Sequence, residues 1–115
     1  MQGSKYPPGA TFALSLNAAT TGTGSVHAFN DCRQTIWTVT TNGEVTDGTV
    51  IIESSNDAAY AGTWTEQDSV DLAAMGTDEK YSNTYPAFSA GFWRARVSET
   101  VVGGTVSVEL NGSLL

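Results

Sequence analysis

One histidine and one cysteine are present, and these are the side chains that most often supply a catalytic base and a nucleophile. His27 lies in a predicted strand and Cys32 follows across a predicted turn, so the two could form a dyad. No G-x-S-x-G turn accompanies them. An ordinary strand histidine and a partly buried thiol are the simpler interpretation. We therefore expect that the protein is not an enzyme.

Metal binding is a second possible chemistry. One Cys and one His cannot supply the three or four ligands that zinc usually takes. Several acids in predicted loops could offer oxygen ligands to calcium, but no D-x-D-x-D-G run is present. Solvated loop carboxylates are the favoured interpretation, and the same acids have almost no specificity as a glycosidase pair. We expect no cofactor and no metal at these acids, which are Asp57, Asp68, Asp71, Asp78 and Glu79.

Arg94 and Arg96 lie two residues apart on one face of a predicted strand, beside Phe92. Paired arginines on an acidic protein commonly meet carboxylates, because a guanidinium donates well to a carboxylate. The carboxylate can belong to the same chain, with Glu53 or Glu109 as candidates. It can also belong to a neighbouring subunit or particle, and both interpretations stay open.

Aromatic residues offer either core packing or stacking on sugar rings. Trp93 shares a predicted strand face with Ala95 and Val97, so we expect it in the core. The aromatic residues that could instead stack on a glycan are Trp37, Trp64, Tyr81 and Tyr85.

Length and charge limit the classes of protein to consider. The chain of 115 residues suits one domain, and its net charge of −7 disfavours nucleic acid and anionic membrane surfaces as partners. No stretch of about 20 apolar residues could span a membrane. The first nine residues lack an apolar signal segment, and the single Cys cannot form an internal disulfide. These features indicate folding in a reducing compartment.

Alternating apolar and polar residues predict β-strands throughout the chain. The dipeptides Asn42-Gly43 and Asp47-Gly48 predict a hairpin turn between strands at 34–41 and 48–55, and Gly103-Gly104 predicts a second hairpin. Pro86 argues against a central strand at its position. Seven to nine short strands favour an all-β fold, a single antiparallel β-sandwich with jelly-roll or immunoglobulin-like topology.

Residues 1–9 depart from the strand pattern. Pro7 and Pro8 favour an extended polyproline conformation and cannot donate to a sheet. We therefore expect an extended N-terminal arm at 1–9, containing Lys5 and Tyr6, and a sandwich domain at 10–115.

Several strand phrases follow one another in a recognisable order. One predicted strand ends in E-S-S-N-D, Glu53 to Asp57, and a Trp follows in G-T-W-T. An Arg-x-Arg strand, F-W-R-A-R-V-S, then leads into the closing segment G-G-T-V-S-V-E-L-N-G. This order resembles that of small β-sandwich proteins found in tailed-bacteriophage particles. The resemblance covers Gly22 to Gly112 and contains no catalytic motif.

The resemblance implies a virion structural protein of the head decoration, or capsid cement, type. Such a protein would assemble in the host cytoplasm, bind the major capsid protein lattice on the outer surface of the head, and stabilise it. We expect a homo-oligomer, first a trimer and second a dimer, because multivalent docking raises avidity on a repetitive lattice. The alternative is a carbohydrate-binding module for host or glycan adhesion. The candidate capsid or subunit contacts are Lys5, Tyr6, Pro7, Pro8, Phe92, Arg94 and Arg96.

Overall fold

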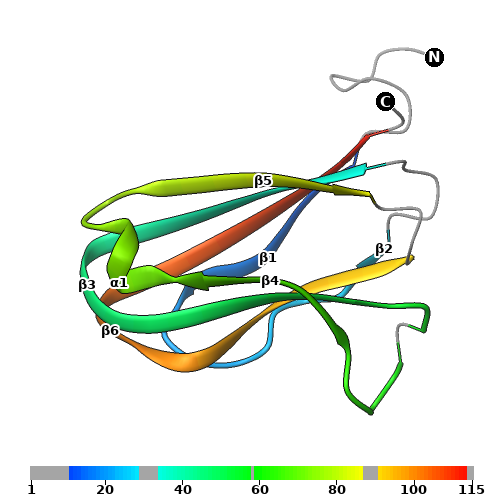
Figure 1. Ribbon diagram of the computed structural model, residues 1–115, viewed down its shortest axis with the longest axis horizontal. Coiled ribbons are helices and arrows are strands. Elements are labelled where there is room, and N and C mark those ends of the chain that lie inside the picture. The colour runs from blue at the N-terminus through cyan, green and yellow to red at the C-terminus, as the bar shows by residue number, and fades with distance from the viewer. Residues whose placement is uncertain (1–10, 29–33, 58, 87–90, 114–115) are drawn as a thin grey trace.

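The computed structural model describes residues 11–28, 34–57, 59–86 and 91–113. In these residues six antiparallel strands form one continuous sheet, and the only helix is a single turn (Figure 1). The all-β prediction is confirmed, whereas the predicted arm at 1–9 lies outside the described residues. The elements are β1 (Thr11–Ala19), β2 (His27–Ala28), β3 (Gln34–Ser55), β4 (Thr65–Asp71), α1 (Leu72–Met75), β5 (Lys80–Pro86) and β6 (Phe92–Ser113).

The two predicted hairpins are wrong, because β3 and β6 are each a single strand of 22 residues. They pair with one another from end to end, and each bends near its middle. Gly43, Gly48 and Gly103 have φ of 89°, 137° and 91°, a backbone region that favours glycine. The glycine dipeptides therefore did mark unusual backbone, but the two halves of each bent strand pair with the other long strand and not with each other.

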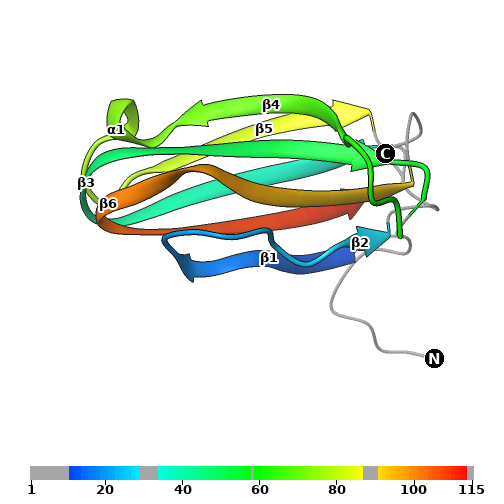
Figure 2. The same cartoon turned by 90° about the horizontal axis from the view of Figure 1, so that it is seen from below.

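The bends fold the sheet over into two layers, which Figures 1 and 2 show from two sides. On one side of the bend the order is β1, the second half of β6, the first half of β3, and β5. On the other side it is β2, the first half of β6, the second half of β3, and β4. Counting the halves separately gives eight segments, four in each layer.

The order of the eight strand segments in the two layers is that of a jelly roll. In an immunoglobulin sandwich the first two strands lie side by side in one sheet, whereas here β1 and β2 lie in different layers. The sequence predicted seven to nine short strands, and the described part of the chain has six because two of them are long enough to serve both layers. Among the described strands β5 pairs only with β3, so its last residue, Pro86, lies on an edge strand as expected.

The core lies between the two layers and follows the predicted alternation. Trp93 and Ala95 are fully buried, and Val97 packs against the core from the same face. The outcome differs at Leu14, which is exposed because a register shift between Leu14 and Leu16 turns Ser15 inward with Leu16. The other large fully buried side chains include Trp37, Val39, Val50, Ile52, Leu72, Val106, Val108 and Leu110.

Candidate functional site

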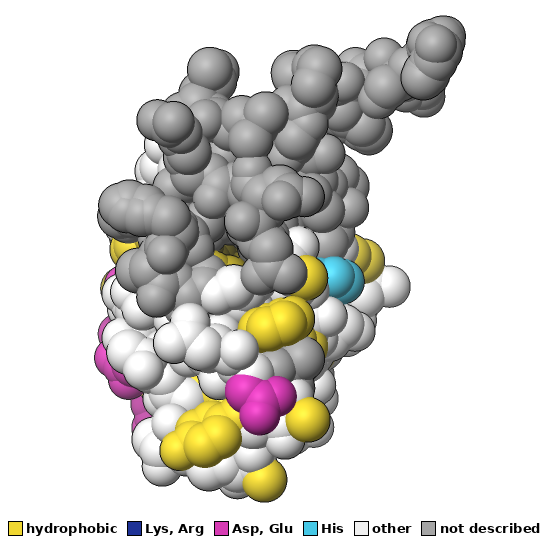
Figure 3. All heavy atoms as spheres, turned by 90° about the vertical axis from the view of Figure 1, so that its right-hand side faces the viewer, with side chains coloured by type: hydrophobic (Ala, Val, Ile, Leu, Met, Phe, Trp, Pro, Cys, Tyr) yellow, Lys and Arg dark blue, Asp and Glu magenta, His cyan; other side chains and the backbone are white. Residues whose placement is uncertain are grey.

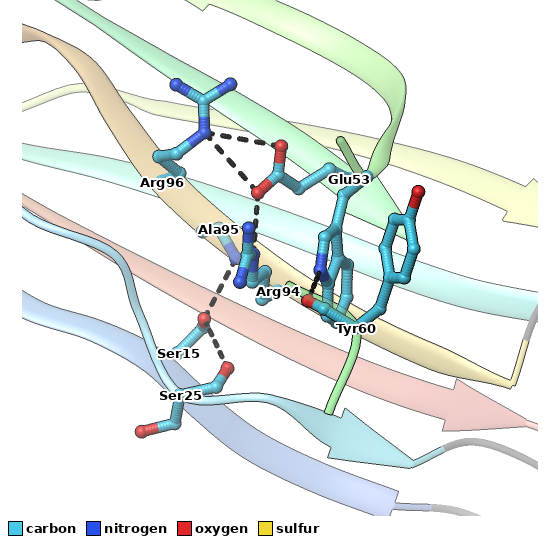
Figure 4. A network of polar contacts seen from close by, with 8 residues as sticks. Ser15, Ser25, Glu53, Tyr60, Arg94, Ala95 and Arg96 are labelled. Atoms are coloured by element: carbon cyan, nitrogen blue, oxygen red, sulfur yellow. Dashed lines mark hydrogen bonds and ion pairs between the residues drawn. The ribbon is translucent and has the colours of Figure 1, made fainter. Parts of the chain in front are cut away.

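Glu53 holds both arginines of β6 on the outer face of the layer that contains β2 and β4, called the second layer below. Arg94 lies opposite Glu53 in the β3–β6 ladder, and its Nε donates to Glu53 Oε2 at 2.6 Å. The Nε of Arg96 donates to Oε1 at 3.3 Å (Figure 4). Glu53 is only 2% exposed, so a buried carboxylate is matched by two partly exposed cations. The intrachain partner is Glu53 and not Glu109, which lies in the other layer opposite Thr38.

Trp64 lies under Arg94 and is 4% exposed. The Cζ of Arg94 is 4.1 Å from the centroid of the Trp64 ring, and Trp64 Nε1 donates to the carbonyl of Tyr60 at 2.9 Å. Trp37 is 1% exposed, inside the core. The prediction that Trp37 or Trp64 stacks on a glycan is therefore wrong, because one ring fills the core and the other is covered by a guanidinium.

Tyr81 and Tyr85 form a polar cluster with Asn83 and Asp68 on the side of the sandwich where β4 and β5 are the edges. Both tyrosine hydroxyls donate to Asp68 Oδ2, from Tyr81 at 3.3 Å and through a short bond from Tyr85. Asn83 Nδ2 donates to the Tyr85 hydroxyl at 2.8 Å. Burial, together with the hydrogen bond to Asp68 and its charge, raises the pKa of Tyr85 well above its usual range. The cluster connects the two layers.

A hollow of about 570 Å³ opens beside Tyr60, between the end of β3 and the start of β4. Tyr60 is 46% exposed, and its backbone N–H donates to the Asp57 carbonyl. Sequence reasoning missed this residue, because the segment between β3 and β4 has no strand pattern; an aromatic residue between two turn formers was the available signal. The hollow is lined by Ser54, Ser55, Asn56, Asp57, Tyr60, Thr63, Trp64, Thr65 and Gln67.

A second hollow, of about 410 Å³, lies beside α1. Its lining mixes the charged residues Asp71, Glu79 and Lys80 with Tyr81 and with apolar residues of α1. The two hollows therefore differ in chemistry, the first being lined mainly by uncharged polar groups.

The loop acids make separate hydrogen bonds to backbone N–H groups. Asp57 accepts from the N–H of Ala59, Asp71 caps the start of α1, and Asp78 accepts from the N–H of Gly43. In the described part of the chain, no three His, Cys, Asp or Glu side chains gather where they could hold a metal ion. His27 Nε2 lies 3.3 Å from the Leu14 carbonyl, and Cys32 lies outside the described residues.

The predicted contact residues fall into two groups. Phe92, Arg94 and Arg96 form the first group. All three are partly buried and lie close together at the start of β6. Lys5, Tyr6, Pro7 and Pro8 lie outside the described residues. Within the described residues, no helix is long and apolar enough to cross a bilayer.

No protein-family model and no curated protein sequence matches this chain. Among solved structures, the SPBc2 prophage-derived protein YomS is similar, with a TM-score of 0.63 and 17% identity. The match covers 96% of this chain and 98% of YomS. The K1 and K2 cleaved adhesin domains of Lys-gingipain, the former from Porphyromonas gingivalis W83, are each 10% identical.

The two adhesin domains have TM-scores of 0.55 and 0.58. The K1 match covers 89% of this chain and 72% of that domain, and the K2 match covers 90% and 71%. This chain has the fold of these proteins. At such low identity the likeness extends to the fold alone.

Proposed function

We propose that the protein is a non-enzymatic structural component of a phage particle, a decoration protein that binds the outer surface of the head. The observation that carries this proposal is the likeness to a prophage-derived protein over 96% of this chain and 98% of the other. Two chains of nearly the same extent are thus folded in the same way. The likeness of the strand phrases to those of small phage β-sandwich proteins supports the same role.

A binding role, as opposed to catalysis, is supported by three carboxylates that make structural hydrogen bonds. Glu53, Asp68 and Asp71 each hold a neighbouring part of the fold through hydrogen bonds. The adhesin domains of similar fold also support a domain that works by attachment. The proposed partners are the major capsid protein lattice and further copies of this chain, a trimer first and a dimer second.

The proposed contact face includes Arg94 and Arg96. Both arginines bond Glu53 through Nε, and among the described residues their terminal amino groups have no hydrogen-bond partner, so these groups can donate to a carboxylate of a partner. Figure 4 shows the terminal nitrogens of Arg96 pointing away from Glu53. The segment from Lys5 to Pro8 is the second proposed contact, which stays a prediction.

Sedimentation with separated phage parts tests the proposal. Heads and tails from the phage that encodes this chain are separated on a gradient, and each is mixed with labelled protein. We expect saturable co-sedimentation with heads. Binding to tails alone would contradict the decoration role, and binding to neither would contradict a place on the particle. Light scattering of the free protein is expected to give a trimer or a dimer, and a strict monomer would contradict the oligomer.

Matched variants test the contact residues. Arg96→Gln should weaken head binding about tenfold, because it removes a cation at the proposed interface. Lys80→Gln is the control, since Lys80 is an exposed cation on β5 of the other layer, and it should change binding less than about twofold. A chain lacking residues 1–9 should also bind heads more weakly, and normal binding by this chain would remove the arm from the contact.

A further inference from the structure

The hollow beside Tyr60 combines an exposed aromatic ring with a wall of hydrogen-bonding side chains. Its volume of about 570 Å³ is within the range of small-molecule sites. We propose that this hollow binds a neutral saccharide. The activity is separate from the proposed structural role, and either can fail without the other.

The backbone around Tyr60 is held before any ligand arrives. Its N–H donates to the Asp57 carbonyl at 3.1 Å, and its own carbonyl accepts from Trp64 Nε1 at 2.9 Å. The phenol of Tyr60 lies against Gly62, and a Cβ added at Gly62 would have to push the ring aside. A ring held in this way loses little conformational entropy on stacking against a ligand.

The polar groups of the hollow match the hydroxyls of a sugar. Gln67 Nε2 donates to Ser54 Oγ at 2.9 Å, which fixes the amide and leaves its carbonyl oxygen with capacity to accept. Hydroxyl and amide groups both donate and accept, as sugar hydroxyls require, while an aromatic face suits the apolar face of a sugar ring. The side chains that supply these groups are Ser55, Asn56, Thr63, Thr65 and Gln67.

The charges around the hollow exclude anions. Asp57 is the charged residue among the described residues that line it, and no Lys or Arg is among them. Arg94 lies over Trp64 and is not among the residues that line the hollow. Figure 3 views the molecule from the end where β3 stops and β4 starts; on the described part of this face hydrophobic and uncharged side chains predominate. A phosphate or an acidic sugar would meet the Asp57 carboxylate without a compensating cation.

Amide NMR of the ¹⁵N-labelled protein tests the site, because it detects weak binding and reports its position. The neutral probes are D-glucose, D-galactose, D-mannose, N-acetyl-D-glucosamine, maltotriose, cellotriose and chitotriose, each titrated to about 50 mM. N-acetylneuraminic acid is the acidic comparison. We expect at least one neutral probe to give saturable shifts at residues 54–57 and 60–67, and to bind at least about fivefold more tightly than the acidic sugar.

Two variants and a control identify the stacking residue. Tyr60→Ala should weaken binding of that probe about tenfold or more, whereas Tyr60→Phe should stay within about threefold, because the ring face remains. Tyr81→Ala removes another exposed tyrosine, outside this hollow, and should leave binding unchanged. The proposal is overturned if no neutral probe shifts these amides, if the acidic sugar binds as well, or if a folded Tyr60→Ala protein binds like the wild type.

Discussion

The indole of Trp37 meets the indole of Trp93 edge to face, with ring centroids 6.3 Å apart and planes inclined by 78°. Trp37 belongs to the first half of β3 and Trp93 to the first half of β6, so the contact joins the two layers. Tyr85 lies 6.2 Å from the first ring and 6.3 Å from the second. This aromatic group packs the core, with Tyr85 extending from it to the polar cluster at the β4–β5 edge.

Two valines of β6 test the assignment of inner and outer faces. Val108 is fully buried and Val102 is 50% exposed. Val108→Asp should destabilise the fold by several kcal/mol, because it places an unpaired charge in the core. Val102→Asp should change the free energy of unfolding by no more than about 0.5 kcal/mol. Urea unfolding measures both, and similar losses in the two variants would show that the faces are misassigned.

Removing the Glu53 carboxylate should destabilise the second layer. Glu53→Gln leaves Arg94 and Arg96 without a charged partner, and the expected loss is about 1–3 kcal/mol because both arginines are partly exposed. The control is Glu99→Gln on β6, the strand of the two arginines, where an exposed carboxylate accepts from Thr49. This change should stay within about 0.5 kcal/mol. A Glu53→Gln protein with wild-type urea stability would show that the arginines do not need this carboxylate.

The Tyr85 hydroxyl should make stability depend on alkaline pH. Its pKa is raised in the folded protein, so the folded state holds the proton more tightly than the unfolded chain, whose tyrosine ionises near pH 10.0. This contribution is complete below that pH and is lost as the pH rises beyond it. Urea unfolding from pH 8 to 11 should therefore show a smaller loss in Tyr85→Phe than in the wild type. An unchanged slope in Tyr85→Phe would contradict the assignment.

The bend in β6 should depend on Gly103. Its φ is 91°, and a Cβ there would overlap the carbonyl oxygen of Glu44 on β3. Gly103→Ala should cost about 3 kcal/mol or more, from backbone strain and a clash with rigid backbone. Gly22→Ala is the matched control, since Gly22 has φ of 99° but no atom near a new Cβ, and strain alone should cost about 1 kcal/mol. Equal thermal shifts in the two variants would exclude the clash.

Side-chain alternation predicted the inner face of several strands correctly. Val106, Val108 and Leu110 are all fully buried, as period 2 requires of a half-buried strand. The two arginines on one face of β6 were also visible, because they lie two residues apart in the sequence. These features depend on neighbours along one strand, which is why the sequence contains them.

The bends and the polar sites were decided by tertiary structure. A glycine with positive φ is compatible with a hairpin turn or a bent strand, and the choice at Gly43 and Gly103 depends on which distant strand pairs with each half. The bend also places Glu109 in the other layer, which leaves Glu53 as the partner of the arginines. Likewise, Tyr85 meets Asp68 because β4 and β5 become edges on the same side of the sandwich. The alternation along each strand determined which side chains face the core. The pairing of distant strands determined which polar side chains contact one another.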